Sequence, residues 1–358
     1  MRKIITKLLF GIFTAFLTTG YLHVEASESF PDWTPIISKE AAFTDSVIQE
    51  TESSVVMDMY MKPASKLPVE KVVYDNPLNP YKTTKVPAQI TKQGRFYFIV
   101  DTFHDQVIYH NKLEDPVSKW RVVSSNLSGP HSIASDGKYY LIADTENDRV
   151  LIFEWNQGGF RLTQQFEGLG VRPHYIQYDE TADCFYVWSS MTCEMYVLAK
   201  NSEDILCIKE ILKLKHMSGH YIRSFTISGD YILFPSGTNQ QILLTDRKTL
   251  QILERFPVPG EVSGMAYIKK IGNYYYMTIS TDDKFDQNKA TIIRTKDLRD
   301  LVHGKYENIA SYFPRIQVPY YIDYMQGYYY MTNHGNSISV FRFQVQNDEL
   351  KYIKAIEY

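Results

Sequence analysis

Cysteine is scarce in this chain, with three residues among 358. A secreted domain that depends on disulfides is normally richer in cysteine and has an even number of them. No two cysteines have the Cys-x-x-Cys spacing of structural zinc sites. We therefore interpret Cys184, Cys193 and Cys207 as buried packing residues with free thiols. All three fall in one repeat, where we place them on three successive strands.

Well-known catalytic motifs are also absent. The chain has no Gly-x-Ser-x-Gly elbow, no His-Glu-x-x-His zinc motif and no phosphate-binding P-loop. Gly168 and Gly170 precede no helical pattern, so they predict a turn rather than a dinucleotide-binding loop. The motif content therefore assigns no reaction.

Long runs of lysine or arginine are missing, and the formal net charge is −3. A mildly acidic chain lacks the long-range attraction for phosphate backbones on which nucleic-acid binding depends. We therefore expect no nucleic-acid partner. The expected partner is a small molecule, a glycan or an extracellular protein, and we expect the protein to be a monomer.

The longest apolar run lies at the N-terminus. Three basic residues precede an apolar run over Leu8–Leu17, and small residues at 24 and 26 follow it, which is the layout of a secretory signal. The run is shorter than the roughly 20 residues that a membrane-spanning helix needs. We predict a signal peptide over residues 1–26, cleaved after Ala26, and a secreted, extracellular protein with no membrane span after signal removal. A retained anchor is the alternative.

Aromatic-rich segments recur through the rest of the chain, and their starts are 43 to 54 residues apart. The segments are Phe96–Phe98, Tyr139–Leu141, Phe185–Val187, Tyr231–Leu233, Tyr274–Tyr276 and Tyr328–Tyr330. Such a period, with turn residues dividing each unit into short strands, is typical of propellers. We predict an all-β fold, a six-bladed β-propeller of four-stranded antiparallel blades, over residues 86–358.

Residues 27–85 do not match the repeat. Their polar and acidic first half is typical of a tether, whereas Val55–Tyr60 and Val69–Tyr74 have strand patterns. We predict a tether or capping segment that covers an outer edge of the propeller. At the other end, Leu350–Tyr358 is predicted to be the fourth strand of blade six, which leaves ring closure to packing between blades.

The turn between the second and third strands of a unit has its own repeat. Asp144–Val150 has the pattern Asp-x-x-Asn-x-Arg-Val, Asp101–Val107 is a variant of it, and Ser236 replaces the aspartate in blade four. This pattern resembles the NHL repeat. In NHL repeats the acidic residue and the asparagine organise the turn, so the resemblance implies a structural role for Asp101, Asp144 and Asn147.

The residue that enters the innermost strand of each blade is expected to face the mouth of the central channel, where propellers usually bind ligands. Aligning the repeats on the turn between their first two strands gives one such residue per blade: Ala88, His131, His174, Arg223, Ser263 and Tyr320. We predict ligand-binding roles for all of these except Ala88. Three further histidines are candidates for the same face, although we interpret each one alone as a polar loop residue, namely His104, His220 and His334.

The chemistry of this ring of residues leaves three interpretations open. Neutral imidazoles bind transition metals, so His131 and His174 with a third ligand would hold a divalent metal, zinc or calcium. Alternatively, Arg223 beside the two imidazoles would bind a carboxylate or phosphate group, because a guanidinium presents a fork of donors. The third interpretation is structural, with the histidines bonded to the neighbouring blade.

The Pro-His steps at His131 and His174 also resemble those of peptidyl-α-hydroxyglycine α-amidating lyase, a six-bladed NHL-type propeller. That family holds zinc with three histidines from channel-facing strands, so the resemblance implies that these two are zinc ligands. Blades four and six have Arg223 and Tyr320 where a third histidine would stand. We therefore expect a binding propeller, with a metal-assisted lyase or hydrolase at the same mouth as the alternative.

Overall fold

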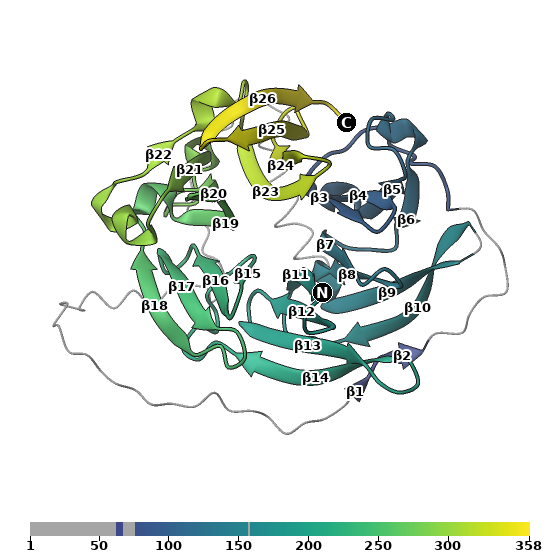
Figure 1. Cartoon of the computed structure of the whole chain (residues 1–358). Helices are drawn as coiled ribbons and strands as arrows, with labels where there is room; N and C mark the ends of the chain where they lie inside the picture. The colour runs from purple at the N-terminus through teal and green to yellow at the C-terminus, as the bar shows by residue number, and fades with distance from the viewer. Residues whose placement is uncertain (1–61, 67–75, 157) are drawn as a thin grey trace, which may run out of the picture. The chain divides into compact units, whose positions relative to one another are not determined.

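The predicted fold is confirmed by a computed structural model, in which six four-stranded antiparallel sheets surround a central axis (Figure 1). The model describes residues 62–66, 76–156 and 158–358. The predicted signal peptide and the two strands predicted at 55–60 and 69–74 lie outside this part of the chain. Within it, no helix is long and apolar enough to cross a membrane.

Each blade runs from its innermost to its outermost strand in chain order. Blade one contains β3 (Pro87–Gln93), β4 (Phe96–Asp101), β5 (Gln106–His110) and β6 (Arg121–Ser124). Blade two contains β7 (Pro130–Ser135), β8 (Tyr139–Asp144), β9 (Arg149–Asn156) and β10 (Gly159–Glu167). Blade three contains β11 (Pro173–Asp179), β12 (Cys184–Ser189), β13 (Glu194–Lys200) and β14 (Leu206–Lys213).

The second half of the ring is less regular. Blade four contains β15 (Thr226–Ser228), β16 (Tyr231–Ser236), β17 (Gln241–Asp246) and β18 (Ile252–Pro257). Blade five contains β19 (Gly264–Ile271), β20 (Tyr274–Thr281), β21 (Thr291–Thr295) and β22 (Glu307–Asn308). Blade six contains β23 (Val318–Met325), β24 (Tyr328–His334), β25 (Val340–Gln346) and β26 (Glu349–Ile356). The innermost strand of blade four, β15, therefore has only three residues.

Short 3₁₀ helices occur in several of the connections. They are η1 (Thr102–His104), η2 (Val117–Lys119), η3 (Thr145–Asn147), η4 (Gly260–Val262), η5 (Gln287–Lys289), η6 (Leu298–His303) and η7 (Ala310–Tyr312). Two of them, η1 and η3, form the turns that carry the NHL-like pattern.

The hydrophobic core lies between neighbouring blades. Every residue of β4, β8 and β12 is buried, because a blade packs against each face of these strands. Their aromatic residues fill the interblade space, and buried phenols bond to polar groups. The Tyr139 hydroxyl, for example, donates a hydrogen bond to the carbonyl of Asp204 in blade three.

The ring closes by packing between blades six and one, as predicted. β26 is the fourth strand of blade six and pairs with β25. Thr84, before blade one, donates its backbone N–H to the carbonyl of Tyr358 at 3.0 Å. On the inner strands, Thr91 Oγ1 donates to Asp323 at 2.6 Å. No strand of blade six comes from the N-terminal part of the chain that the structure describes.

Two very short strands lie on the outer edges of neighbouring blades. β1 (Lys62–Pro63) pairs with β14, and β2 (Ser65–Lys66) pairs with β10. Ala64, between them, is buried and donates its N–H to the carbonyl of Leu206. These strands cover the edges of blades two and three.

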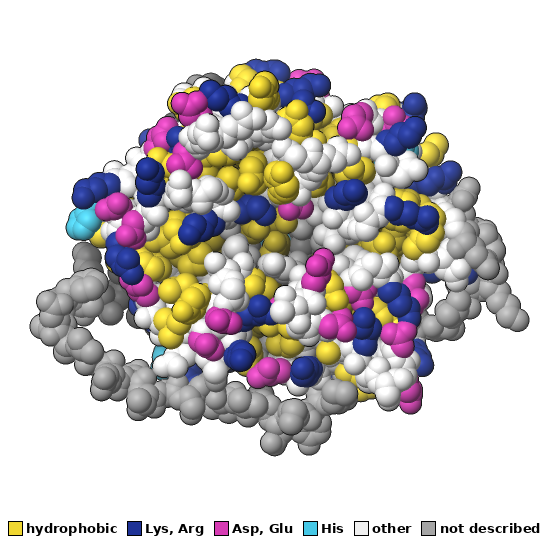
Figure 2. Space-filling model, in the orientation of Figure 1, with side chains coloured by type: hydrophobic (Ala, Val, Ile, Leu, Met, Phe, Trp, Pro, Cys, Tyr) yellow, Lys and Arg dark blue, Asp and Glu magenta, His cyan; other side chains and the backbone are white. Residues whose placement is uncertain are grey.

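On the face of the molecule shown in Figure 2, basic and acidic side chains are interspersed.

The three cysteines are buried and have free thiols, as predicted. The placement of Cys193 on a strand is wrong. It lies in the tight turn before β13 with a φ of 54°, and its thiol contacts the carbonyl of Met217. The turn that joins β12 to β13 includes Cys193, so this residue does not take part in the hydrogen-bonded ladder of the two strands.

Candidate functional site at the channel mouth

The residues that line the mouth share one local geometry. In blade two, Pro130 pairs with Asp144 and Ser132 pairs with Ala143, so His131 is the extra residue of a β-bulge. Such a bulge re-aims one side chain out of the regular alternation of the strand. A one-residue shift also occurs at the corresponding place in blades one, three and six, at Ala88, His174 and Tyr320. In blade four the shift falls between Ile222 and Thr226, a stretch that begins with Arg223. In blade five Ala266 is the extra residue on β19, and a second irregularity lies opposite it at Ser280 on β20.

The bulge shows that the prediction of Ser263 for blade five is wrong. Ser263 ends η4, is buried, and donates its hydroxyl to the carbonyl of Gly260. Ala266 takes the ring position instead. In blades one, two, four and five the ring residue comes six residues before a glycine with positive φ, which is Gly272 in blade five. That spacing is the sequence signal from which Ala266 could have been found.

The turns that contain η1 and η3 hold the two histidines of the blades that follow them. Thr102 Oγ1 in η1 donates to the carbonyl of Pro130, and Thr145 Oγ1 in η3 donates to the carbonyl of Pro173, both at 2.8 Å. Asp144, which is fully buried, accepts the N–H of Ser128 and bonds to Asn147. The turn between the second and third strands of one blade therefore fixes the proline that precedes the ring histidine of the next blade.

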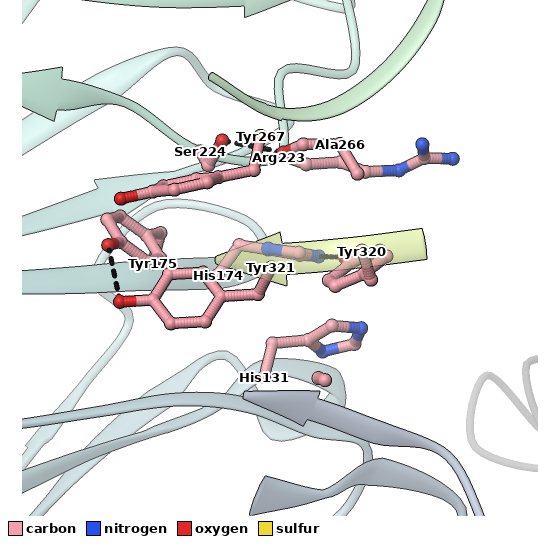
Figure 3. Close-up of a pocket in the computed structure, with 10 residues that line it drawn as sticks. His131, His174, Tyr175, Arg223, Ser224, Ala266, Tyr267, Tyr320 and Tyr321 are labelled. Carbon is pink, nitrogen blue, oxygen red and sulfur yellow. Dashed lines mark hydrogen bonds between the residues drawn. The ribbon is translucent and has the colours of Figure 1, made fainter. Parts of the chain in front are cut away.

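These side chains surround one small cavity. Its lining includes His131, His174, Arg223, Ala266 and Tyr320. Figure 3 shows His131, Tyr320 and Arg223 extending to one side of the strands and the phenol groups of Tyr175 and Tyr267 to the other. The cavity has room for only about one water molecule. A larger ligand would have to lie above it, at the mouth.

The two imidazoles lie side by side, with ring centroids 4.0 Å apart. His131 Nδ1 is 2.8 Å from the carbonyl oxygen of Gly129, which can only accept, so Nδ1 carries the proton. His174 bonds to the backbone of Arg223, and its Nε2 lies 3.0 Å from the hydroxyl of Tyr221. Each ring is thereby fixed in one orientation by the main chain.

A third imidazole belongs to the same mouth. His334 stacks on Tyr320 at 4.9 Å between centroids, and its Nε2 donates to the carbonyl of Pro87 at 3.1 Å. His334 thus lies on the face for which it was a candidate, and it ends a strand rather than lying in a loop. Sequence comparison did not place it in the ring because it has no equivalent among the entry residues.

Two guanidinium groups flank Tyr221 in this mouth. Arg223 and Arg172 lie 5.2 and 5.6 Å from the centre of its ring. Arg172 also forms an ion pair with Glu146 at 2.7 Å and a hydrogen bond to the Tyr221 hydroxyl. Arg223 donates to the hydroxyl of Ser280. Within the described part of the chain, no carboxylate forms an ion pair with Arg223.

The histidines are neutral at physiological pH. Burial, reinforced by the charge of Arg172, lowers the pKa of His131 to about 3. Burial lowers the pKa of His174 well below its ordinary value, and it lowers that of His334 to about 4. The positive charge at the mouth therefore comes from the arginines.

Comparison with known proteins leaves the family open. No family model matches the chain, and no curated protein matches it. Among solved structures, a candidate 6-phosphogluconolactonase from Bacteroides uniformis has a TM-score of 0.54 at 11% identity, covering 75% of this chain and 83% of that one. The WD40 propeller domain of Doa1 has a TM-score of 0.51 at 10% identity, covering 83% and 88%. Identities this low show the propeller fold alone.

Arg172 could have been found from the sequence by comparing blades two and three. It has a φ of 60° and stands two residues before His174, where blade two has Gly129 with a φ of 54°. Its N–H bonds to Asp148 at 2.8 Å just as that of Gly129 bonds to Asp105. Comparing the two repeats therefore places the Arg172 side chain at the position that blade two leaves to glycine, two residues before the ring histidine.

The mouth does not fit a protein-bound metal. Within the described residues, no three His, Cys, Asp or Glu side chains are grouped so that they could hold an ion. The acceptor nitrogen of His174 already bonds to Tyr221, and Arg172 and Arg223 would repel a cation. We therefore derive no step through zinc or calcium.

Proposed function

We propose that this propeller is a secreted binding protein that recognises an anionic group, a carboxylate or phosphate, of a small molecule or glycan at the channel mouth. Arg223 carries the proposal. It is a partly buried guanidinium in a concave site without a carboxylate partner in the described chain. Charges in such places are normally paired, and a ligand anion would supply the partner.

The surroundings of Arg223 support an anion rather than a cation. Of the two guanidiniums, one is compensated by Glu146, so the cluster keeps a net positive charge. The imidazoles, being neutral, add none of the negative charge that a cation would need. Tyr320, whose pKa burial raises, stays protonated, and its hydroxyl lies 3.5 Å from His174 Nε2.

Titration calorimetry of the mature protein tests this function. D-glucuronate and glucose 6-phosphate are the anionic probes, and glucose is the neutral control. We expect at least one anion to bind and Arg223→Gln to weaken it about ten- to hundredfold, the value of a hydrogen bond to a charged group. Arg299→Gln is the matched control, because Arg299 is exposed and pairs with Glu254 away from the channel lining. Equal binding of glucose, or an unchanged affinity in Arg223→Gln, contradicts the proposal.

Export is tested separately, because residues 1–26 lie outside the described structure. N-terminal sequencing of protein from the medium should begin at Ser27 or within a few residues of it. Material that retains Met1 and stays with the membrane would show the alternative, a retained anchor.

A further inference from the structure

The mouth contains acceptors as well as donors, and the acceptors follow from the backbone contacts of the histidines. His131 Nδ1 donates to Gly129 and His334 Nε2 donates to Pro87. A neutral imidazole that donates through one nitrogen has a lone pair on the other. His131 Nε2 and His334 Nδ1 are therefore hydrogen-bond acceptors and cannot contact an anion favourably.

His174 shows how such an acceptor is satisfied within this site. Its Nε2 accepts the hydroxyl proton of Tyr221 at 3.0 Å, and the same hydroxyl oxygen bonds to Arg172. One hydroxyl thus bridges an imidazole acceptor and a guanidinium donor. His131 occupies the equivalent position one blade earlier, yet its Nε2 accepts no hydrogen bond from the part of the chain that the structure describes.

From this arrangement we infer that the ligand carries hydroxyl groups next to its anionic group, as a sugar acid or a sugar phosphate does. The anionic group pairs with Arg223, and a neighbouring hydroxyl donates to His131 Nε2, as Tyr221 does to His174. The inference rests on the proposed function, since it describes the same site. It adds a requirement that anion binding alone does not have.

Two pairs of probes separate hydroxyl recognition from anion recognition. D-glucuronate is compared with cyclohexanecarboxylate, and glucose 6-phosphate with hexyl phosphate; only the first of each pair carries hydroxyls. For the anion type that binds, we expect the hydroxylated member to bind at least about fivefold more tightly, as one or two neutral hydrogen bonds would give. Equal affinities within the pair overturn the inference and leave the proposed function standing. Failure of all four probes to bind overturns both.

Variants of His131 assign the preference to its acceptor nitrogen. His131→Phe keeps a flat ring without an acceptor, whereas His131→Gln keeps an acceptor in its amide oxygen. We expect the Phe variant to lose most of the preference for the hydroxylated probe while still binding the anion, and the Gln variant to keep part of it. Thermal unfolding of both variants establishes that they are folded. A preference that survives in folded His131→Phe would contradict the assignment to His131.

Discussion

The two sides of the channel mouth are built differently. His131 and His174 follow prolines whose carbonyls are held by threonines of η1 and η3, so the repeat itself fixes them. Tyr221 and Arg223 instead precede β15, which has three residues, whereas β7 and β11 have six and seven. The comparison teaches that one face of the site is regular scaffold, whereas on the other face the repeat predicts the position of Arg223 but not that of its neighbour Tyr221.

The largest expected difference between the two sides concerns the first residue of the turn between the second and third strands of a blade. Asp144 in blade two is buried and bonds to Arg149, Asn147 and the N–H of Ser128, so Asp144→Ala should lower the free energy of unfolding by roughly 3 kcal/mol. The equivalent Ser236 in blade four has a buried hydroxyl without a partner in the structure, so Ser236→Ala should change it by less than about 1 kcal/mol. Urea unfolding measures both, and equal losses would show that blade four relies on this position as blade two does.

The buried histidines of the mouth should also determine how the free energy of unfolding responds to acid. The folded pKa of His131 is about 3 and that of His334 about 4, below the ordinary value of about 6.5, so the unfolded chain binds more protons. The free energy of unfolding should therefore be constant above pH 7 and fall as the pH drops from 6.5 towards 4. Arg172 and Arg223 oppose protonation of His131 in the folded state.

Urea midpoints at pH 7.5 and 4.5 measure this effect. The decrease should be smaller in His131→Gln than in the wild type, because one of the buried bases is gone. Exposed His303 provides the control, since His303→Gln should leave the decrease unchanged. An identical decrease in wild type and His131→Gln would mean that His131 is not held neutral by the fold.

A smaller effect is expected for the threonine that supports His174. Thr145→Val removes the hydroxyl that donates to Pro173 and leaves a buried carbonyl unpaired, at about 1–2 kcal/mol. In the equivalent turn of blade four, Thr238 makes only a 3.4 Å contact with His220, so Thr238→Val should be within about 0.5 kcal/mol of wild type. Chemical denaturation of the two variants side by side decides this, and a larger loss for Thr238→Val would reverse the comparison.

The smallest effect concerns the blade-five register. Ser263 does not line the cavity, so Ser263→Ala should leave anion affinity unchanged within about twofold. Ala266 does line it, and Ala266→Asp should weaken anion binding by placing a carboxylate beside the arginines. Calorimetry with the better anionic probe measures both. Weaker binding in Ser263→Ala, with unchanged binding in Ala266→Asp, would show that Ser263 occupies the ring position of blade five, as the sequence predicted.

The six blades and five of the ring residues could be predicted because each follows from repetition. The aromatic second strands recur at a regular spacing. The ring residues that the structure bears out take the same step into the innermost strand, namely Ala88, His131, His174, Arg223 and Tyr320. Ser263 was wrong because blade five has no proline directly before its ring residue, so its register depended on the turn alone, and it was set three residues too early relative to Gly272.

The remaining members of the site come from places that the repeat does not specify. Tyr221 lies in the irregular connection before blade four, and His334 lies at the end of a second strand. Their roles depend on which blades face each other across the channel, and that is a property of the closed ring rather than of any single unit. Arg172 is intermediate, since its left-handed backbone is visible only by comparison with Gly129.

The most direct test of the account is a crystal structure of the mature protein grown with the better-binding hydroxylated anion. The account predicts electron density at the channel mouth, with the anionic group on Arg223 and a hydroxyl within hydrogen-bonding distance of His131 Nε2. Density for the ligand elsewhere on the propeller, with the mouth unchanged and Arg223 unpaired, would contradict the assignment of the mouth as the binding site.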